Sequence, residues 1–296
     1  MKHSMYRSAK LFVATSFLFV LPVVCESGFS RSAAADVVTL TPANDATLFS
    51  EDGTFANGSG EHVFLGTTSN FYPRRSLLKF DLAAIPAGST ITAVSLRLTL
   101  TRTRAFTTMP VTVRRLTADW NEGRSNPTNA EGFGAPAIAG DATWTHRTYP
   151  TILWGTDGGD FAATPSATTI IPATTTGNHT WSGAGLVTDV QAWKNGTLSN
   201  FGWIMTGDET ANGTARRYAS RSNASTSSRP QLTVTYTRPS PCGRADLNND
   251  SILDGNDFIA FINAFAADLP AADVEPDGIV DGSDFIFFIN AFGAGC

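Results

Sequence analysis

The chain has 296 residues, a formal net charge of −5 and an isoelectric point near 5.3. Only 16% of the residues are charged, which excludes a coiled coil and a highly charged disordered chain, and the mild acidity gives no support for nucleic-acid binding. No apolar run reaches the roughly 20 residues that a membrane-spanning helix needs. The length favours about two domains.

Residues 1–35 have the features of a secretory signal peptide. A basic start precedes an apolar run over residues 11–24, and the small residues 32–35 offer a cleavage site. Lipoprotein processing at Cys25 is an alternative, although Val24 stands before it where a small residue is usual. We therefore expect a secreted or cell-surface protein whose mature chain does not span the membrane.

Alternating apolar and polar residues dominate residues 36–237. Every second residue is apolar in the segments 78–82, 94–100 and 232–236. Such alternation predicts strands with one buried and one exposed face, as in antiparallel sheets, and turn-forming residues separate these segments. The pattern predicts a mainly β domain with the architecture of an antiparallel jelly-roll β-sandwich.

The order of short motifs along this domain is more specific. The motifs are Val38–Leu40, Ser76–Leu82, Ile85–Gly88, Val94–Leu100, Asp119–Glu122, Val190–Trp193, Phe201–Ile204, Ala219–Arg221 and Pro230–Val234. Together they resemble the DNRLRE domain, a jelly-roll module of secreted proteins. The resemblance implies a carbohydrate-binding-module-like domain, with alginate as one ligand class. The DNRLRE family also includes relatives of polysaccharide-degrading enzymes.

Sugars are bound by aromatic faces and planar polar groups, and acidic sugars also need arginine or lysine. Residues 36–237 are rich in arginine, and the connection from residue 119 to 161 is rich in aromatic residues. The candidate glycan-binding residues are Lys79, Arg97, Arg114, Arg217, Arg221, Trp120, Trp144 and Trp154. Alternatively, the arginines are ordinary surface charges and the rings close the edge of the sandwich.

No residue is predicted to be catalytic. Glycoside hydrolysis needs two positioned carboxylates, and Asp119, Glu122, Asp157 and Asp160 are available in the aromatic connection. None of them stands in a motif that specifies a reaction. We expect a binding protein rather than an enzyme, with a polysaccharide-degrading enzyme kept as an alternative.

Residues 238–241 form the predicted linker to an acidic segment, residues 242–296. Within this segment, residues 246–265 and 273–292 match at 13 of 20 positions, which indicates two copies of one unit. Each copy begins with oxygen-bearing side chains at the spacing of an EF-hand loop, whose seventh position supplies a backbone carbonyl. The predicted calcium ligands are Asp246, Asn248, Asp250, Ile252, Asp254 and Asp257, then Asp273, Glu275, Asp277, Ile279, Asp281 and Asp284.

Apolar residues recur at helical spacing after each loop, which predicts two short helices. In an oxidising compartment, Cys242 and Cys296 are expected to form a disulfide, because Cys25 leaves with the signal peptide. Two loop–helix units framed by Pro241-Cys242-Gly243 and Gly295-Cys296 resemble the GC-type dockerin of secreted planctomycete proteins. The resemblance implies a small α-helical module that binds two calcium ions and a cohesin-like protein or a cell-surface anchor.

These features together predict a secreted, non-catalytic protein that binds an acidic, alginate-like polysaccharide and is tethered by a calcium-dependent dockerin. One alternative is a structural surface or matrix protein whose sandwich makes protein contacts only. The second alternative is the polysaccharide-degrading enzyme.

Overall fold

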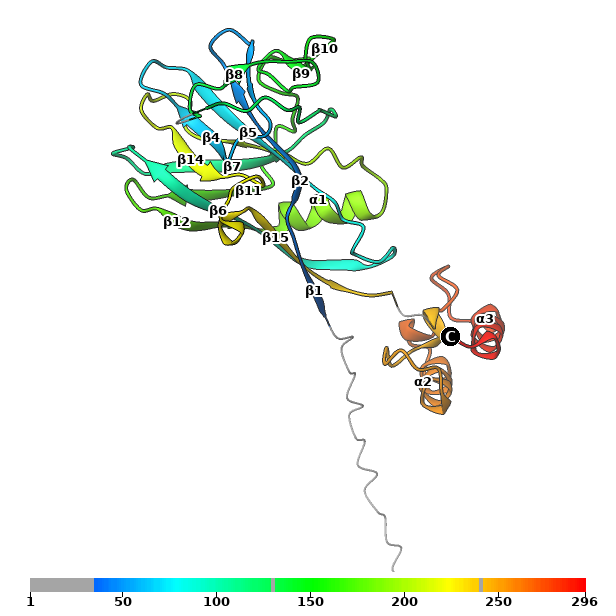
Figure 1. The fold of residues 1–296 in the computed structure, drawn as a ribbon. Coiled ribbons are helices and arrows are strands. Elements are labelled where there is room, and N and C mark those ends of the chain that lie inside the picture. The colour runs from blue at the N-terminus through cyan, green and yellow to red at the C-terminus, as the bar shows by residue number, and fades with distance from the viewer. Residues whose placement is uncertain (1–34, 129–130, 240–241) are drawn as a thin grey trace, which may run out of the picture.

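A computed structural model describes residues 35–128, 131–239 and 242–296. The predicted signal peptide lies almost entirely outside these residues, and so does half of the predicted linker. The described chain forms a β-sandwich followed by a small helical module (Figure 1). No helix among the described residues combines the length and apolar character that crossing a bilayer requires.

The strands follow one another with one helix inserted late in the sandwich. Their bounds are β1 (Asp36–Leu40), β2 (Pro42–Phe49), β3 (Phe55–Asn57), β4 (His62–Thr67), β5 (Pro73–Phe80), β6 (Thr90–Thr103), β7 (Met109–Arg115), β8 (Ala135–Pro136), β9 (His146–Thr148), β10 (Ile152–Leu153), β11 (Ala167–Ile171), β12 (Gly177–Ser182), β13 (Trp203–Thr206), β14 (Arg216–Ala219) and β15 (Gln231–Thr237). Helix α1 (Ala184–Lys194) lies between β12 and β13 and packs against β6.

Antiparallel pairing links almost all of these strands in the order β1-β15-β6-β14-β4-β5-β13-β7-β11. Strand β12 adds to β6, while β2 pairs with β5 and carries β3 and β8. Strand β4 pairs with β14 at one side and, through its last residues, with β5 at the other. It therefore connects the two layers of the sandwich, which confirms the predicted antiparallel β-sandwich; the jelly-roll topology stays a prediction.

The main core fills the space between the two layers. The alternation of β6 places Val94, Leu96, Leu98 and Leu100 in it, together with the buried rings of Trp181 and Trp203. The indole of Trp181 donates to the carbonyl of Val111 at 2.8 Å, so its polar atom is satisfied inside the core.

A second core lies on the other face of the layer that contains β2, β5 and β13. Leu48, Leu77 and Ile204 point to that face and pack against Trp120 and Trp154. The long connection between β7 and β11 covers this layer, which is why these strands are apolar on both faces.

Gly202 brings this connection close to the sheet just before β13. It has a φ of +81°, and a Cβ at this position would lie 2.1 Å from the carbonyl oxygen of Leu78. The carbonyl of Gly202 accepts a hydrogen bond from the amide of Leu116 at 3.0 Å. The close backbone approach therefore requires glycine.

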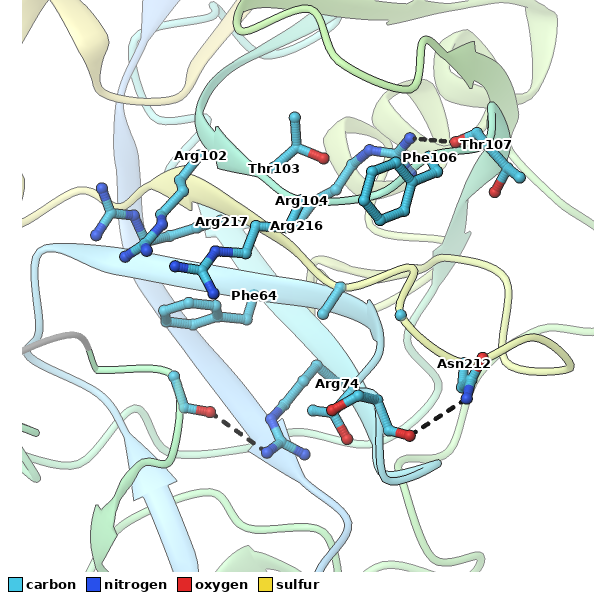
Figure 2. A pocket seen from close by; sticks show the side chains of 15 residues that line it. Phe64, Arg74, Arg102, Thr103, Arg104, Phe106, Thr107, Asn212, Arg216 and Arg217 are labelled. Carbon is cyan, nitrogen blue, oxygen red and sulfur yellow. Dashed lines mark hydrogen bonds between the residues drawn. The ribbon is translucent and has the colours of Figure 1, made fainter.

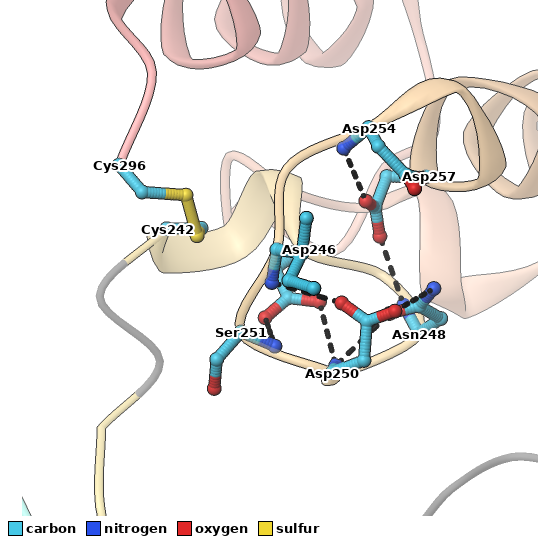
Figure 3. Close-up of a disulfide and its surroundings, with 9 residues drawn as sticks. Cys242, Asp246, Asn248, Asp250, Ser251, Asp254, Asp257 and Cys296 are labelled. Carbon is cyan, nitrogen blue, oxygen red and sulfur yellow. Dashed lines mark hydrogen bonds between the residues drawn. A yellow bond between two sulfur atoms is a disulfide. The ribbon is translucent and has the colours of Figure 1, made fainter.

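The helical module consists of α2 (Gly255–Ala266) and α3 (Gly282–Ala294), with short 3-10 turns η2 (Gly243–Ala245) and η3 (Pro270–Ala272); a further turn, η1 (Thr226–Ser228), precedes β15. Phe261 and Phe288 are fully buried and stack with ring centres 4.1 Å apart. A disulfide joins Cys242 to Cys296 and confirms the predicted pairing (Figure 3). It closes the two ends of a module whose apolar core is small.

Candidate functional site

A cavity of about 730 Å³ opens beside β4, β6 and β14, at the end of the sandwich where β4 joins the two layers. Five arginines line it, and no acidic side chain does so among the described residues: Arg74, Arg102, Arg104, Arg216 and Arg217 (Figure 2). We call this cavity the arginine pocket. Its volume falls within the range of about 300–1,000 Å³ that is usual for ligand sites.

Arg216 is the most unusual member of the arginine pocket. Its side chain is only 1% exposed, because β14 directs it to the same side as the core residue Tyr218. One terminal nitrogen, Nη2, donates to the carbonyls of Thr107 and Pro172 at 3.0 and 2.9 Å. The other two nitrogens, Nε and Nη1, are buried and have no hydrogen-bond partner.

Arg216 also lacks a counter-charge, since none of the salt bridges among the described residues involves it. Burial lowers the pKa of its guanidinium, as expected for a cation taken out of water without a carboxylate beside it. Buried charges are normally paired, and buried donors normally have acceptors. Arg216 therefore has the properties of a residue that binds an anionic ligand.

A shift in strand register places two further positive side chains close together. The pairing of β14 with β6 shifts between Arg217 and Tyr218, so that Arg217 lies opposite Arg102. Like charges directly opposite each other destabilise a strand pair. Desolvation lowers the pKa of Arg217, and the charge of Arg102 lowers it further. An anion bound between them would relieve this repulsion.

Arg74 differs because it already has a partner. It is 1% exposed, forms a salt bridge with Glu51, and stacks over the ring of Phe49 with 4.7 Å between its guanidinium carbon and the ring centre. It also donates to the carbonyl of Gly132 at 3.3 Å. We therefore regard Arg74 as a wall of the pocket rather than as an anion-binding group.

The predicted tryptophan platform is not formed. Trp120 and Trp154 are each 5% exposed, and their indoles donate to the carbonyls of Phe201 and Thr143, both at 2.9 Å. The ring of Trp144 is covered by the guanidinium of Arg75, 4.6 Å from the ring centre. All three rings pack against the outer face of the β2–β5–β13 layer, so they belong to the second core.

Four of the predicted basic contacts have protein partners away from the arginine pocket. Lys79 binds Asp119 at 3.1 Å, and Arg221 forms a two-bond salt bridge with Glu122. The other two donate to neighbouring oxygens: Arg97 to the Ser227 carbonyl at 3.0 Å, and Arg114 to the Thr206 hydroxyl at 3.1 Å. Of the predicted glycan-binding residues, Arg217 is the one that lines the arginine pocket.

Three of the four acids considered for catalysis also have structural partners. Asp119 and Glu122 form the salt bridges just described, and Asp160 accepts from the amides of Gly155 and Thr156, both at 2.8 Å. These contacts hold the connection between β7 and β11 in place. None of the four acids lines either of the two pockets found among the described residues.

Sequence reasoning missed Arg102, Arg104 and Arg216 as members of one site. The available signal was the spacing of the two basic pairs, Arg102/Arg104 and Arg216/Arg217, on segments with strand character. Their proximity depends on the pairing of β6 with β14, across more than a hundred residues of sequence. The register of that pairing cannot be read from either strand alone.

The first acidic loop brings three of its predicted ligands together. Oxygens of Asp246, Asp250 and Asp257 lie within 4.8 Å of one another (Figure 3). Asp257 is fully buried, and its two oxygens accept from the amides of Asn248 and Asp254 at 3.2 and 3.0 Å. Converging carboxylates at this spacing have the chemistry that Ca²⁺ prefers.

The second loop repeats this hydrogen bonding. Asp284 is fully buried and accepts from the amides of Glu275 and Asp281, both at 2.9 Å. These backbone donors hold the pKa of Asp284 below its ordinary value. Gly278 has a φ of +85°, and Ser251 takes the equivalent left-handed conformation in the first loop with a φ of +67°. The two loops therefore share one geometry although their turn residues differ.

The last two predicted ligand positions of each loop also organise the helix that follows. Asp254 and Asp281 are the N-caps of α2 and α3, and each forms a capping box with the aspartate three residues later. A capping box satisfies backbone amides at the start of a helix. The same side chains can thus begin the helix and complete the oxygen-lined loop.

No curated protein matches the chain. The family model for carbohydrate-binding module family 96 matches residues 36–149. This segment contains Arg74, Arg102 and Arg104 of the arginine pocket, whereas Arg216 and Arg217 lie beyond it. The match supports a carbohydrate-binding module in the sandwich and a polysaccharide as its partner.

Proposed function

We propose that the sandwich binds an acidic polysaccharide, alginate-like in carrying one carboxylate on each sugar, in the arginine pocket. The observation that carries this proposal is Arg216, a buried guanidinium with two unpartnered nitrogens in the wall of the cavity. The match to a carbohydrate-binding module family supports the sugar. The position of Arg217 opposite Arg102 in the β14–β6 pairing supports the negative charge of the ligand.

Carboxylates suit this site because guanidinium groups donate strong, charge-assisted hydrogen bonds to them. A bound carboxylate would supply acceptors to Arg216, and a carboxylate of another sugar, on the opposite side of β14, would neutralise the repulsion between Arg102 and Arg217. The role is non-catalytic, since the site consists of cations and neutral side chains and offers neither a carboxylate pair nor a base for bond cleavage.

Retention of the purified full chain on immobilised alginate, with a neutral β-glucan as the comparison polymer, tests this proposal. We expect alginate to retain the wild type and to release Arg216→Met. Arg97→Ala is the matched control, because Arg97 is an arginine of β6, the strand that pairs with β14, but lies outside the pocket. Equal retention of wild type and Arg216→Met would contradict the assignment, and so would preference for the neutral polymer.

We also propose that residues 242–296 form a calcium-dependent, dockerin-like tether on a secreted or cell-surface protein. Two ions would be held by the first loop through Asp246, Asp250 and Asp257, and by the equivalent positions of the second loop. The convergence of the first three carboxylates supports the fit. The partner would be a cohesin-like protein or a component of the cell envelope.

Isothermal titration of the calcium-free full chain with Ca²⁺ tests the tether's metal chemistry. We expect two sites, reduced to one by either Asp257→Ala or Asp284→Ala and lost in the double variant. The two substitutions remove equivalent residues, so each serves as the matched control for the other. Absence of calcium-binding heat in the wild type would overturn the proposal.

A further inference from the structure

Phe106 is the most exposed large apolar side chain among the described residues, at 94% of its surface. It lies in the turn between β6 and β7 and belongs to the lining of the arginine pocket. A single exposed phenylalanine needs no explanation by itself. Its place in the lining of a cavity that contains five arginines does need one.

The backbone that carries Phe106 is held on both sides. The preceding residue, Ala105, is 2% exposed, and its amide donates to the hydroxyl of Thr103 at 3.1 Å. The following residue, Thr107, accepts the hydrogen bond from Nη2 of Arg216 at 3.0 Å. The ring is therefore exposed although its backbone is anchored, so little of its main-chain freedom remains to be lost on binding.

The bond between Thr107 and Arg216 also couples the ring to the cation. Figure 2 shows the hydrogen bond from the guanidinium of Arg216 to Thr107, the residue that follows Phe106. Phe106 thus offers a flat apolar face, and Arg216, which binds the residue after it, offers unpartnered donors. Pyranose sugars present a similar combination, because their C–H groups form apolar faces while their substituents are polar.

We propose that Phe106 is the sugar-stacking residue of the arginine pocket: its ring packs on the C–H face of a sugar unit while Arg216 holds the acidic group of the same chain. The inference rests on the proposed binding of acidic polysaccharide and adds the specificity of that site. Both elements are needed, so an acidic sugar chain binds more tightly than a polyanion that has no sugar face.

The affinity of the full chain for alginate oligosaccharides, measured by isothermal titration, tests the role of the ring. Loss of the stacking face in Phe106→Ala is expected to weaken binding by about tenfold, whereas Phe106→Tyr keeps the face and stays close to wild type. Phe133→Ala is the matched control, because Phe133 is 81% exposed but is not part of the pocket lining. Both side chains are at the surface, so the three variants remain folded.

Inorganic polyphosphate is the second probe, since it carries negative charge without a C–H face. Its affinity is expected to fall in Arg216→Met and to stay unchanged in Phe106→Ala. An equal loss of both probes in Phe106→Ala would show that the residue only shapes the cation cluster, and would overturn the stacking role. So would an equal effect of Phe133→Ala on the oligosaccharides.

The remaining outcomes separate this inference from the function on which it rests. If alginate binding depends on Arg216 but not on Phe106, the stacking role is wrong and the proposed function stands. If the wild type does not bind acidic oligosaccharides, both fail together.

Discussion

Asp45 in β2 is expected to make the stability of the sandwich fall as pH rises. Its side chain is 2% exposed, and burial raises its pKa from 3.8 to about 7. The hydrogen bond from the Arg221 amide opposes this rise, and the nearby charge of Glu122 adds to it. One carboxylate oxygen accepts from the amide of Arg221 at 2.6 Å, and the amide of Asp45 donates to Glu122 at 2.7 Å. The carboxyl group is thus neutral in the folded protein at mildly acidic pH.

The direction follows from proton binding. Between pH 4 and 7 the unfolded chain loses the proton of Asp45 while the folded chain keeps it, so the free energy of unfolding decreases as pH rises through this interval. Each tenfold difference in proton affinity is worth about 1.4 kcal/mol, and the interval from 3.8 to about 7 therefore corresponds to about 4 kcal/mol. This contribution is complete below pH 4 and is lost above pH 7.

Asp45→Asn tests this reasoning, because the amide has the same shape, can still accept from the Arg221 amide and does not ionise. Urea unfolding at pH 4.5, 6 and 8 gives the two free energies, and tryptophan fluorescence follows the sandwich alone, since all six tryptophans lie in it. Relative to wild type, the variant is expected to gain about 3 kcal/mol from the lowest to the highest pH, because part of the total change precedes pH 4.5. A difference between the two proteins that does not change with pH would refute the argument.

Two further substitutions separate structural roles from binding. Arg221→Ala removes the partner of buried Glu122 and is expected to lower stability by about 1–3 kcal/mol while leaving retention on alginate unchanged; loss of retention by the folded variant would place Arg221 in the binding site. Gly202→Ala puts a methyl group against the carbonyl of Leu78 and is expected to cost more than about 2 kcal/mol, seen as a lower melting temperature; an unchanged melting temperature would contradict the close backbone approach.

Local sequence patterns were sufficient to predict strands of the sandwich such as β6. The alternation of Val94, Leu96, Leu98 and Leu100 identified β6 and its buried face, because the side chains of a strand point to opposite sides in turn. The same reasoning was incomplete for β5 and β13. Leu77 and Leu78 are both fully buried, since one faces the main core and the other the core beneath the β7–β11 connection.

The second core explains why the predicted tryptophans were misplaced. Trp120 and Trp154 lie in a long connection without regular alternation, and composition alone does not tell whether such rings cover a sheet or face solvent. The consecutive apolar residues of β5 and β13 were the available clue, because a strand that is apolar on both faces must be covered on both.

The chain's own residue order determined the two-part organisation, the alternating strands, the duplicated acidic loops and the pairing of Cys242 with Cys296, because each depends on short-range spacing or on a simple count of cysteines. Only the tertiary structure decided which cations gather in one place. Arg102 and Arg216 meet through the long-range pairing of β6 and β14, whose shifted register sets the positions of the arginines. The structure also shows that Arg216 keeps unpartnered donors, whereas the charge of Arg221 is balanced by Glu122.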